Sequence, residues 1–142
     1  MIRMVIESRL ENVSLIGGAV RGIAENLSID SMGSYHLELC VVEAVTNVIK
    51  HAYHLEAGHS VELEILIQTD RLTFKVNDSG DSMDISKISS LQFDPSNVKT
   101  LPERGMGTFI LKSLMDEVGY EIVKGRNVLT MSKSIKTRAP SA

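Results

Sequence analysis

Three polar residues follow one another at intervals of four in the first half of the chain: Glu43, Asn47 and His51. In a helix, side chains four residues apart lie on the same face. An amide oxygen next to a carboxylate suits a Mg²⁺ ion that also binds phosphate oxygens and keeps part of its water. A solvated polar helix face explains the same spacing, so the residues alone leave both interpretations open.

A second candidate is the sequence Asp78-Ser79-Gly80, which ends an alternating stretch that predicts a strand. An aspartate at the end of a strand can accept a hydrogen bond from an amino group on a flat ring, and a glycine beside it lets another group come close. The same residues are also typical of an ordinary turn. Here too, both interpretations stay open.

The third candidate is a Gly-x-Gly pattern at Gly105 and Gly107, where a predicted helix begins. The unpaired N–H groups and the positive end of a helix suit a phosphate group. A dinucleotide-binding fingerprint is incomplete because Ile110 stands in place of its third glycine, and no Gly-Lys-Ser or Gly-Lys-Thr is present to form a P-loop. A plain helix start is the alternative.

Taken together, the three candidates resemble a known ATP-binding fold. The resemblance lies in the segments EAVTNVIKHAY (43–53), VNDSGDSMD (76–84) and ERGMGTFILKSLMDEV (103–118). In their order along the chain and in their residues, these segments resemble the motifs of the ATPase superfamily of histidine kinases, gyrase, Hsp90 and MutL. Within it, they are most similar to the small bacterial anti-sigma factors that are serine-protein kinases of partner-switching pathways.

The resemblance implies a role for each candidate around the metal and the base. Asn47 matches the asparagine that binds Mg²⁺ across the nucleotide phosphates, and Glu43 matches the carboxylate that orients or deprotonates the attacking hydroxyl. Asp78 matches the aspartate that reads adenine, with Gly80 beside it. Met83 packs either on the adenine or in the core.

The resemblance also implies contacts at the phosphate end. His51, at the third polar position of the helix motif, contacts phosphate or shapes the lid. The remaining implied nucleotide contacts are five consecutive residues: Arg104, Gly105, Met106, Gly107 and Thr108. The chain departs from many relatives in two places. Ser82-Met83 stands where a glycine is often found two residues after Gly80, and Arg126-Asn127 replaces a Gly-Thr pair near the adenine. The sequence therefore leaves the floor of the base pocket undetermined.

Hydrophobic periodicity predicts the elements that must position these residues. The predicted strands are residues 2–10, 61–68, 71–78, 120–125 and 127–135. The predicted helices are residues 11–27, a second helix capped by Ser31 or Ser34 and ending near Tyr53, and residues 105–118. The last four strands are arranged as two hairpins. This order of elements favours one α+β domain with helices packed on one face of a sheet.

The resemblance gives this arrangement a more specific form. It implies a single-domain, two-layer α/β sandwich of the histidine-kinase-like ATPase (Bergerat) type, with a mixed, mostly antiparallel sheet. The domain covers residues 1–142. Residues 79–104 form its ATP lid, and residues 136–142 form a frayed tail.

Composition narrows the class of protein. The chain has 142 residues, of which 43% are hydrophobic and 23% are charged, and its formal net charge is −3. This length suits one domain, and the acidic balance argues against direct binding of nucleic acid. No apolar run approaches the roughly 20 residues of a membrane span, and the single Cys40 excludes an internal disulfide. We expect a cytoplasmic protein with no membrane contact.

The function that the resemblance implies is an ATP-dependent serine/threonine-protein kinase with Mg²⁺ as cofactor. Such a protein is a homodimer that binds ATP or ADP, a sigma factor and an anti-sigma factor antagonist. The alternative is a nucleotide-gated binding module of the same kind of pathway with little kinase activity, or a target other than a sigma factor. The catalytic half of a sensor histidine kinase is disfavoured, because no helical hairpin for a phosphoacceptor histidine precedes the first strand.

Overall fold

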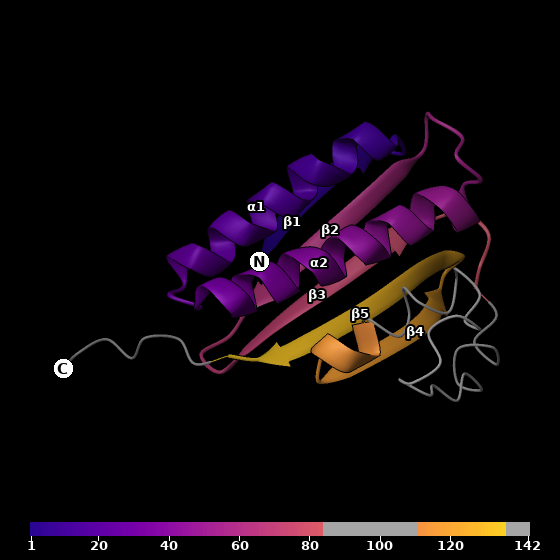
Figure 1. Ribbon diagram of the computed structural model, residues 1–142. Coiled ribbons are helices and arrows are strands. Elements are labelled where there is room, and N and C mark those ends of the chain that lie inside the picture. The colour runs from indigo at the N-terminus through magenta and orange to yellow at the C-terminus, as the bar shows by residue number, and fades with distance from the viewer. Residues whose placement is uncertain (84–110, 136–142) are drawn as a thin grey trace, which may run out of the picture.

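In the computed structural model, which describes residues 1–83 and 111–135, two long helices lie side by side on one face of a five-stranded sheet (Figure 1). The strand order is β1-β2-β3-β5-β4, and all four pairings are antiparallel. The strands are β1 (Ile2–Glu7), β2 (Ser60–Ile67), β3 (Arg71–Asp78), β4 (Glu117–Val123) and β5 (Arg126–Ser134). This two-layer arrangement confirms the predicted α+β fold.

The helical layer begins with a short 3-10 turn, η1 (Leu10–Asn12), that leads into α1 (Val13–Asn26). It continues with α2 (Ser31–Asn47), which ends in a π-helical turn, η2 (Val48–Ala52). The N-cap of α2 is Asp30, whose side chain accepts a hydrogen bond from the N–H of Gly33 at 2.6 Å. The expected caps, Ser31 and Ser34, both lie within the helix.

The core lies between the helices and the sheet. Alternate residues of β2 and β3 point toward the helices and have exposed fractions of 2% or less, namely Val61, Leu63, Ile65, Leu72, Phe74 and Val76. They join buried residues of both helices in one hydrophobic cluster. α1 and α2 approach each other closely at Gly17, because a Cβ there would lie 2.8 Å from Cγ2 of Val42.

Both predicted hairpins are present. β2 and β3 are joined at Thr69-Asp70, with the N–H of Gln68 donating to the carbonyl of Arg71 at 2.9 Å. β4 and β5 are joined through Lys124 and Gly125, whose φ angles are 51° and 78°. Two consecutive positive φ values are typical of a type I′ turn, which matches the twist of antiparallel strands.

The predicted boundaries differ most at the end of the first strand and at the junction between the last helix and the strand predicted for 120–125. The first strand ends at Glu7 rather than at residue 10, because the chain turns there into η1. The helix predicted for 105–118 has its described part at 111–114, and the chain is already in β4 at Glu117. Val118 and Tyr120 pair with Met131 and Leu129 of β5. Sheet pairing therefore overrides a helical spacing that runs on to Val118.

Among residues 1–83 and 111–135, no helix has the length and apolar character needed to cross a membrane.

Candidate functional site

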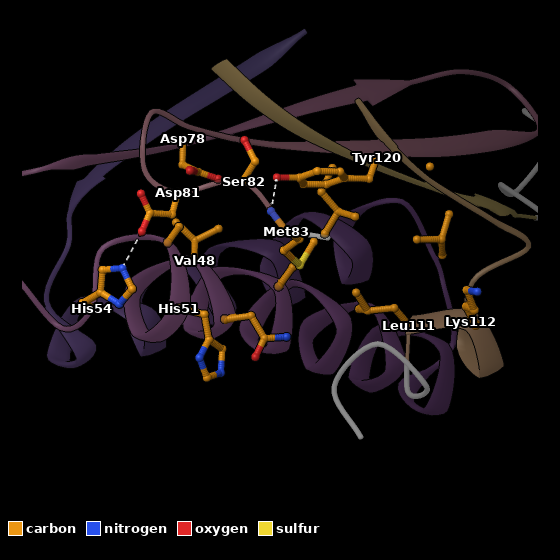
Figure 2. A pocket seen from close by; sticks show the side chains of 16 residues that line it. Val48, His51, His54, Asp78, Asp81, Ser82, Met83, Leu111, Lys112 and Tyr120 are labelled. Carbon is orange, nitrogen blue, oxygen red and sulfur yellow. Dashed lines mark hydrogen bonds and ion pairs between the residues drawn. The ribbon is translucent and has the colours of Figure 1, made fainter. Parts of the chain in front are cut away.

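A cavity of about 390 Å³ opens between the end of α2 with η2, the end of β3, and residues of β4, β5 and the turn at 111–114 (Figure 2). Four of the residues singled out in the sequence line it: Asn47, His51, Asp78 and Met83. Asn47 is the last residue of α2, His51 belongs to η2, Asp78 ends β3, and Met83 follows in the next segment. The fold therefore brings two of the three candidate segments to one place.

Asp78 is the most buried of these residues, with an exposed fraction of 3%. Its Oδ1 accepts two hydrogen bonds, from the N–H of Gly80 at 2.9 Å and from Nδ2 of Asn127 at 2.8 Å. Burial raises the pKa of Asp78, whereas these two bonds and the positive charge of Arg126 act in the opposite direction. The carboxyl is thus held in one orientation at the wall of the cavity.

Position 80 requires a glycine, because the backbone of another segment comes very close to it. A Cβ at this position would lie 2.5 Å from the carbonyl oxygen of Ala52, at the end of η2. The same carbonyl accepts a hydrogen bond from the N–H of Asp81 at 3.0 Å. The sequence predicted a close approach at Gly80, and the structure identifies the neighbour as the end of the helix that carries Asn47 and His51.

The helix face beside the cavity holds Asn47 and His51 in succession. Glu43 lies one turn before Asn47 on α2, is partly buried, and is not among the described residues that line the cavity. The π-helical turn follows directly after Asn47, and such turns are frequent at functional sites.

The predicted phosphate-binding residues Arg104 to Thr108 lie outside the described residues, as do residues 84–104 of the predicted lid. Directly beyond them, the helical turn at 111–114 contributes Leu111 and Lys112 to the cavity wall. Lys112 therefore adds a cation to this wall. Lys112 was not among the predicted site residues, although it lies only four residues after Thr108 in the same predicted helix.

The metal prediction can be tested against the donor set. Among the described residues, no group of three or more His, Cys, Asp or Glu side chains could hold a metal ion. A Mg²⁺ ion commonly takes one or two protein ligands and completes its shell with phosphate oxygens and water. The amide of Asn47 at the cavity fits such an ion only when a nucleotide supplies the other ligands.

Asn127 is the main site residue that the sequence left undetermined. It lies opposite Asp78 in the β3–β5 pairing, has an exposed fraction of 1% and donates to the Asp78 carboxyl. The resemblance placed this position near the adenine, but its bond to Asp78 could not be predicted, because nothing in the sequence shows that β3 pairs with β5. Tyr120, on the neighbouring strand β4, was not predicted either. It lines the cavity, and its hydroxyl accepts a hydrogen bond from the N–H of Met83 at 2.9 Å (Figure 2).

Comparison with known proteins agrees with this geometry. The family model for the histidine kinase-like ATPase domain matches residues 6–133. The chain belongs to the histidine kinase-like ATPase family. Among curated relatives in this family, it is similar to serine-protein kinase RsbW of Bacillus cereus strain Q1, with 30% identity over 138 residues that cover 95% of this chain and 85% of that protein.

Other comparisons point the same way. Serine-protein kinase RsbW of Bacillus licheniformis is 34% identical over 130 residues, 89% of this chain and 81% of that protein. A chain in the SiaB–SiaC complex of Pseudomonas aeruginosa has a TM-score of 0.67 at 13% identity, covering 93% of this chain and 88% of that one. The mycobacterial sensor histidine kinase MprB has a TM-score of 0.55 at 13% identity, covering 95% and 100%. The two structural likenesses concern the fold.

Proposed function

We propose that this chain is an ATP-dependent serine-protein kinase that acts as an anti-sigma factor, binding a sigma factor and phosphorylating a serine of that factor's antagonist. The observation that carries the proposal is the meeting of Asn47, His51 and Asp78 at one cavity. The family of the chain, and relatives of 30–34% identity named as serine-protein kinases, support the reaction type. The cavity volume of about 390 Å³ lies in the range usual for small-molecule sites.

The base end of the nucleotide would lie against Asp78. An ionised carboxyl only accepts hydrogen bonds, so it pairs with the exocyclic amine of adenine. Met83, Leu129 and Val118 add apolar surface to the same cavity, which suits the faces of a flat ring. The adenine would therefore be recognised by one polar contact inside a mostly apolar pocket.

The phosphate end would lie along Asn47 and toward the glycine-rich segment at 105–108. When bound, Mg²⁺ neutralises negative charge on the phosphates. Asn47 would hold that ion through its amide oxygen, and backbone N–H groups at 105–108 would donate to phosphate oxygens. Positioning and neutralisation of charge are the main tasks in phosphoryl transfer.

Glu43 would act on the protein substrate. As a bond forms between the serine oxygen and the γ-phosphorus, the bond to the β-phosphate oxygen breaks and ADP leaves. The proton of the serine hydroxyl passes to the Glu43 carboxylate. Glu43 stands one helical turn from Asn47, so the general base and the metal ligand share one rigid element.

Partner switching would follow from one nucleotide-loaded surface that serves two proteins. With ATP bound, the protein would hold the sigma factor. An unphosphorylated antagonist would displace the sigma factor and become phosphorylated, unless ADP occupies the site. We further propose that the protein works in the cytoplasm as a homodimer.

Capture of partners followed by a transfer assay tests this function. The purified chain is used as bait with Mg-ATP and, separately, with Mg-ADP, and the bound proteins are identified by mass spectrometry. Captured partners are then incubated with γ-labelled ATP in a single-turnover assay. We expect a sigma factor among the partners retained with ATP, and a small second protein that gains label on serine.

Two outcomes would contradict parts of the proposal. Nucleotide-dependent capture without any labelled protein would favour the binding module with little kinase activity. Labelling of a partner together with capture of a target that is not a sigma factor would keep the kinase and remove the anti-sigma role.

A further inference from the structure

Asn127 sits at the centre of a hydrogen-bond network at the base end of the cavity. Its Nδ2 donates to Oδ1 of Asp78 at 2.8 Å and to the carbonyl of Gly80 at 3.0 Å. Its Oδ1 accepts from Oγ of Ser82 at 2.6 Å. One amide with an exposed fraction of 1% thus binds the last residue of β3 and two residues of the segment that follows it.

The rest of that segment is also held in place. The N–H of Ser79 donates to the Tyr53 hydroxyl at 2.8 Å, and the exposed side chain of Asp81 pairs with His54 at 2.7 Å (Figure 2). The N–H of Met83 donates to the hydroxyl of Tyr120. Residues 79–83 are therefore fixed to the residues directly after η2, to β4 and to β5, so the carboxyl of Asp78 lies in a preformed frame.

We propose that Asn127 is a positioning residue for base selectivity: by donating to Oδ1 of Asp78, it turns the other carboxyl oxygen toward the base and makes the site accept a 6-aminopurine and reject a 6-oxopurine. The inference rests on the proposed nucleotide-binding function and deepens it. It assigns selectivity to a residue at which the chain departs from the Gly-Thr pair of many relatives.

The chemistry of the two purines explains the selectivity. A 6-aminopurine such as adenine presents a donor at position 6, which pairs with an ionised carboxyl. A 6-oxopurine such as hypoxanthine presents a carbonyl acceptor there, so two acceptors would face each other at position 6. A site built to pair with a donor discriminates strongly against a ligand that leaves its buried polar group unpaired.

Without the amide of Asn127, the carboxyl would lose one of the bonds that favour its ionised form. Burial raises the pKa of Asp78, and the bonds from Asn127 and Gly80 oppose that effect, as does Arg126. A protonated carboxyl can donate a hydrogen bond, so it can pair with the carbonyl of a 6-oxopurine. Removal of the donor at 127 should therefore weaken selectivity more than it weakens binding in general.

The test uses two substitutions of nearly equal shape, Asn127→Thr and Asn127→Val. Threonine keeps a donor at this position and valine does not. Dissociation constants of Mg-ADP and Mg-IDP, which differ only in the purine ring, are measured by calorimetry for the wild type and for each variant. Thermal melting confirms that each variant is folded. Thr130→Val, on the same strand but away from the cavity, is the matched control.

We expect the wild type to bind ADP at least tenfold more tightly than IDP. Asn127→Val should lower this ratio about tenfold, whereas Asn127→Thr and Thr130→Val should keep it within about threefold. Ser82→Ala, at an exposed position, should lower the ratio by about two- to threefold because it frees the amide oxygen of Asn127. This variant keeps the proposal testable if Asn127→Val does not fold.

If Asn127→Val weakens the binding of ADP and of IDP by the same factor, Asn127 is only structural. A ratio of the two dissociation constants that stays unchanged in both Asn127→Val and Ser82→Ala would also overturn the inference. Either result leaves the proposed function intact, since the wild type still prefers ADP. A wild type that binds neither nucleotide, or binds both equally, would overturn the inference and the proposed role of Asp78 together.

Discussion

At the scale of single residues, Asp78 is an ionisable group in a nearly dry position. Its burial raises its pKa above the ordinary value of 3.8. A carboxyl whose pKa is higher in the folded state contributes stability that is fully present below its unfolded pKa and is lost as the pH rises through the folded pKa. At neutral pH, the ionised Asp78 therefore lowers the free energy of unfolding.

The substitution Asp78→Asn separates stability from binding. Asparagine keeps an oxygen that can accept from Asn127 and Gly80 but carries no charge. We expect the melting temperature at pH 7 to rise by a few degrees, about what 1 kcal/mol gives a chain of this size, while binding of adenine nucleotide is lost. The gain should shrink as the pH is lowered toward 3.8. A gain that is independent of pH would exclude the buried charge as its cause.

Glu43 is predicted to act on transfer and not on binding. Glu43→Gln should leave the affinity for Mg-ATP within about threefold and should lower the rate of phosphoryl transfer by about 10²–10⁴-fold, the usual contribution of a general base. Glu38→Gln is the control, because Glu38 lies on the same helix and pairs with Arg21 at 3.8 Å. Transfer at the wild-type rate in Glu43→Gln would remove Glu43 from the mechanism.

At the scale of elements, the contact between α1 and α2 depends on one glycine of an adjacent pair. A Cβ at Gly17 would lie 2.8 Å from Cγ2 of Val42, whereas a Cβ at Gly18 would have nothing within 4 Å. Both glycines lie inside α1, where alanine is the better helix former.

The two alanine substitutions should therefore have opposite effects. Gly17→Ala should lower the free energy of unfolding by about 1–3 kcal/mol, because it overpacks the helix contact. Gly18→Ala should raise it by about 0.5–1 kcal/mol. Chemical denaturation of both variants measures the difference. If both variants are stabilised, the helices can move apart without lowering the free energy of unfolding, and the close contact is not important for stability.

The elements were predictable where their signals are local. Alternation along 61–68 and 71–78 was enough to predict the first hairpin, and the second was predicted from 120–125 and 127–135. The end of the last helix was not predictable, because Val118 fits the end of a helical pattern as well as it fits the start of β4. Only the pairing of β4 with β5 decides between the two.

For the candidate site too, local motifs were predictable from the sequence and strand pairings were not. Asn47, His51 and Asp78 were found from their spacing and from a family resemblance, because each belongs to a local motif. Tyr120 was not found, and Asn127 was noted only as a departure near the adenine, because strand pairings bring Tyr120 to the cavity and Asn127 to Asp78. A sequence shows which residues share an element more directly than it shows which elements are neighbours.

At the scale of the whole molecule, ligand binding should stabilise the fold, since the cavity is assembled from both layers. At a concentration of 100 times its dissociation constant, a ligand that binds only the folded state adds about 2.7 kcal/mol. Mg-ATP should thus raise the melting temperature by several degrees. Removal of the metal with EDTA should abolish most of the gain, and in Asn47→Ala the addition of Mg²⁺ should make little difference. An equal shift with and without Mg²⁺ in the wild type would argue against the metal role of Asn47.

The claim on which the rest depends is that segments far apart in the chain converge on one magnesium-bound adenine nucleotide. A crystal structure with Mg²⁺ and a non-hydrolysable ATP analogue tests it most directly. We expect the amine of adenine within 2.7–3.2 Å of the Asp78 carboxyl, the amide of Asn47 on the metal, and residues 105–108 against the phosphates. A nucleotide bound elsewhere, or an adenine that does not touch Asp78, would contradict the claim.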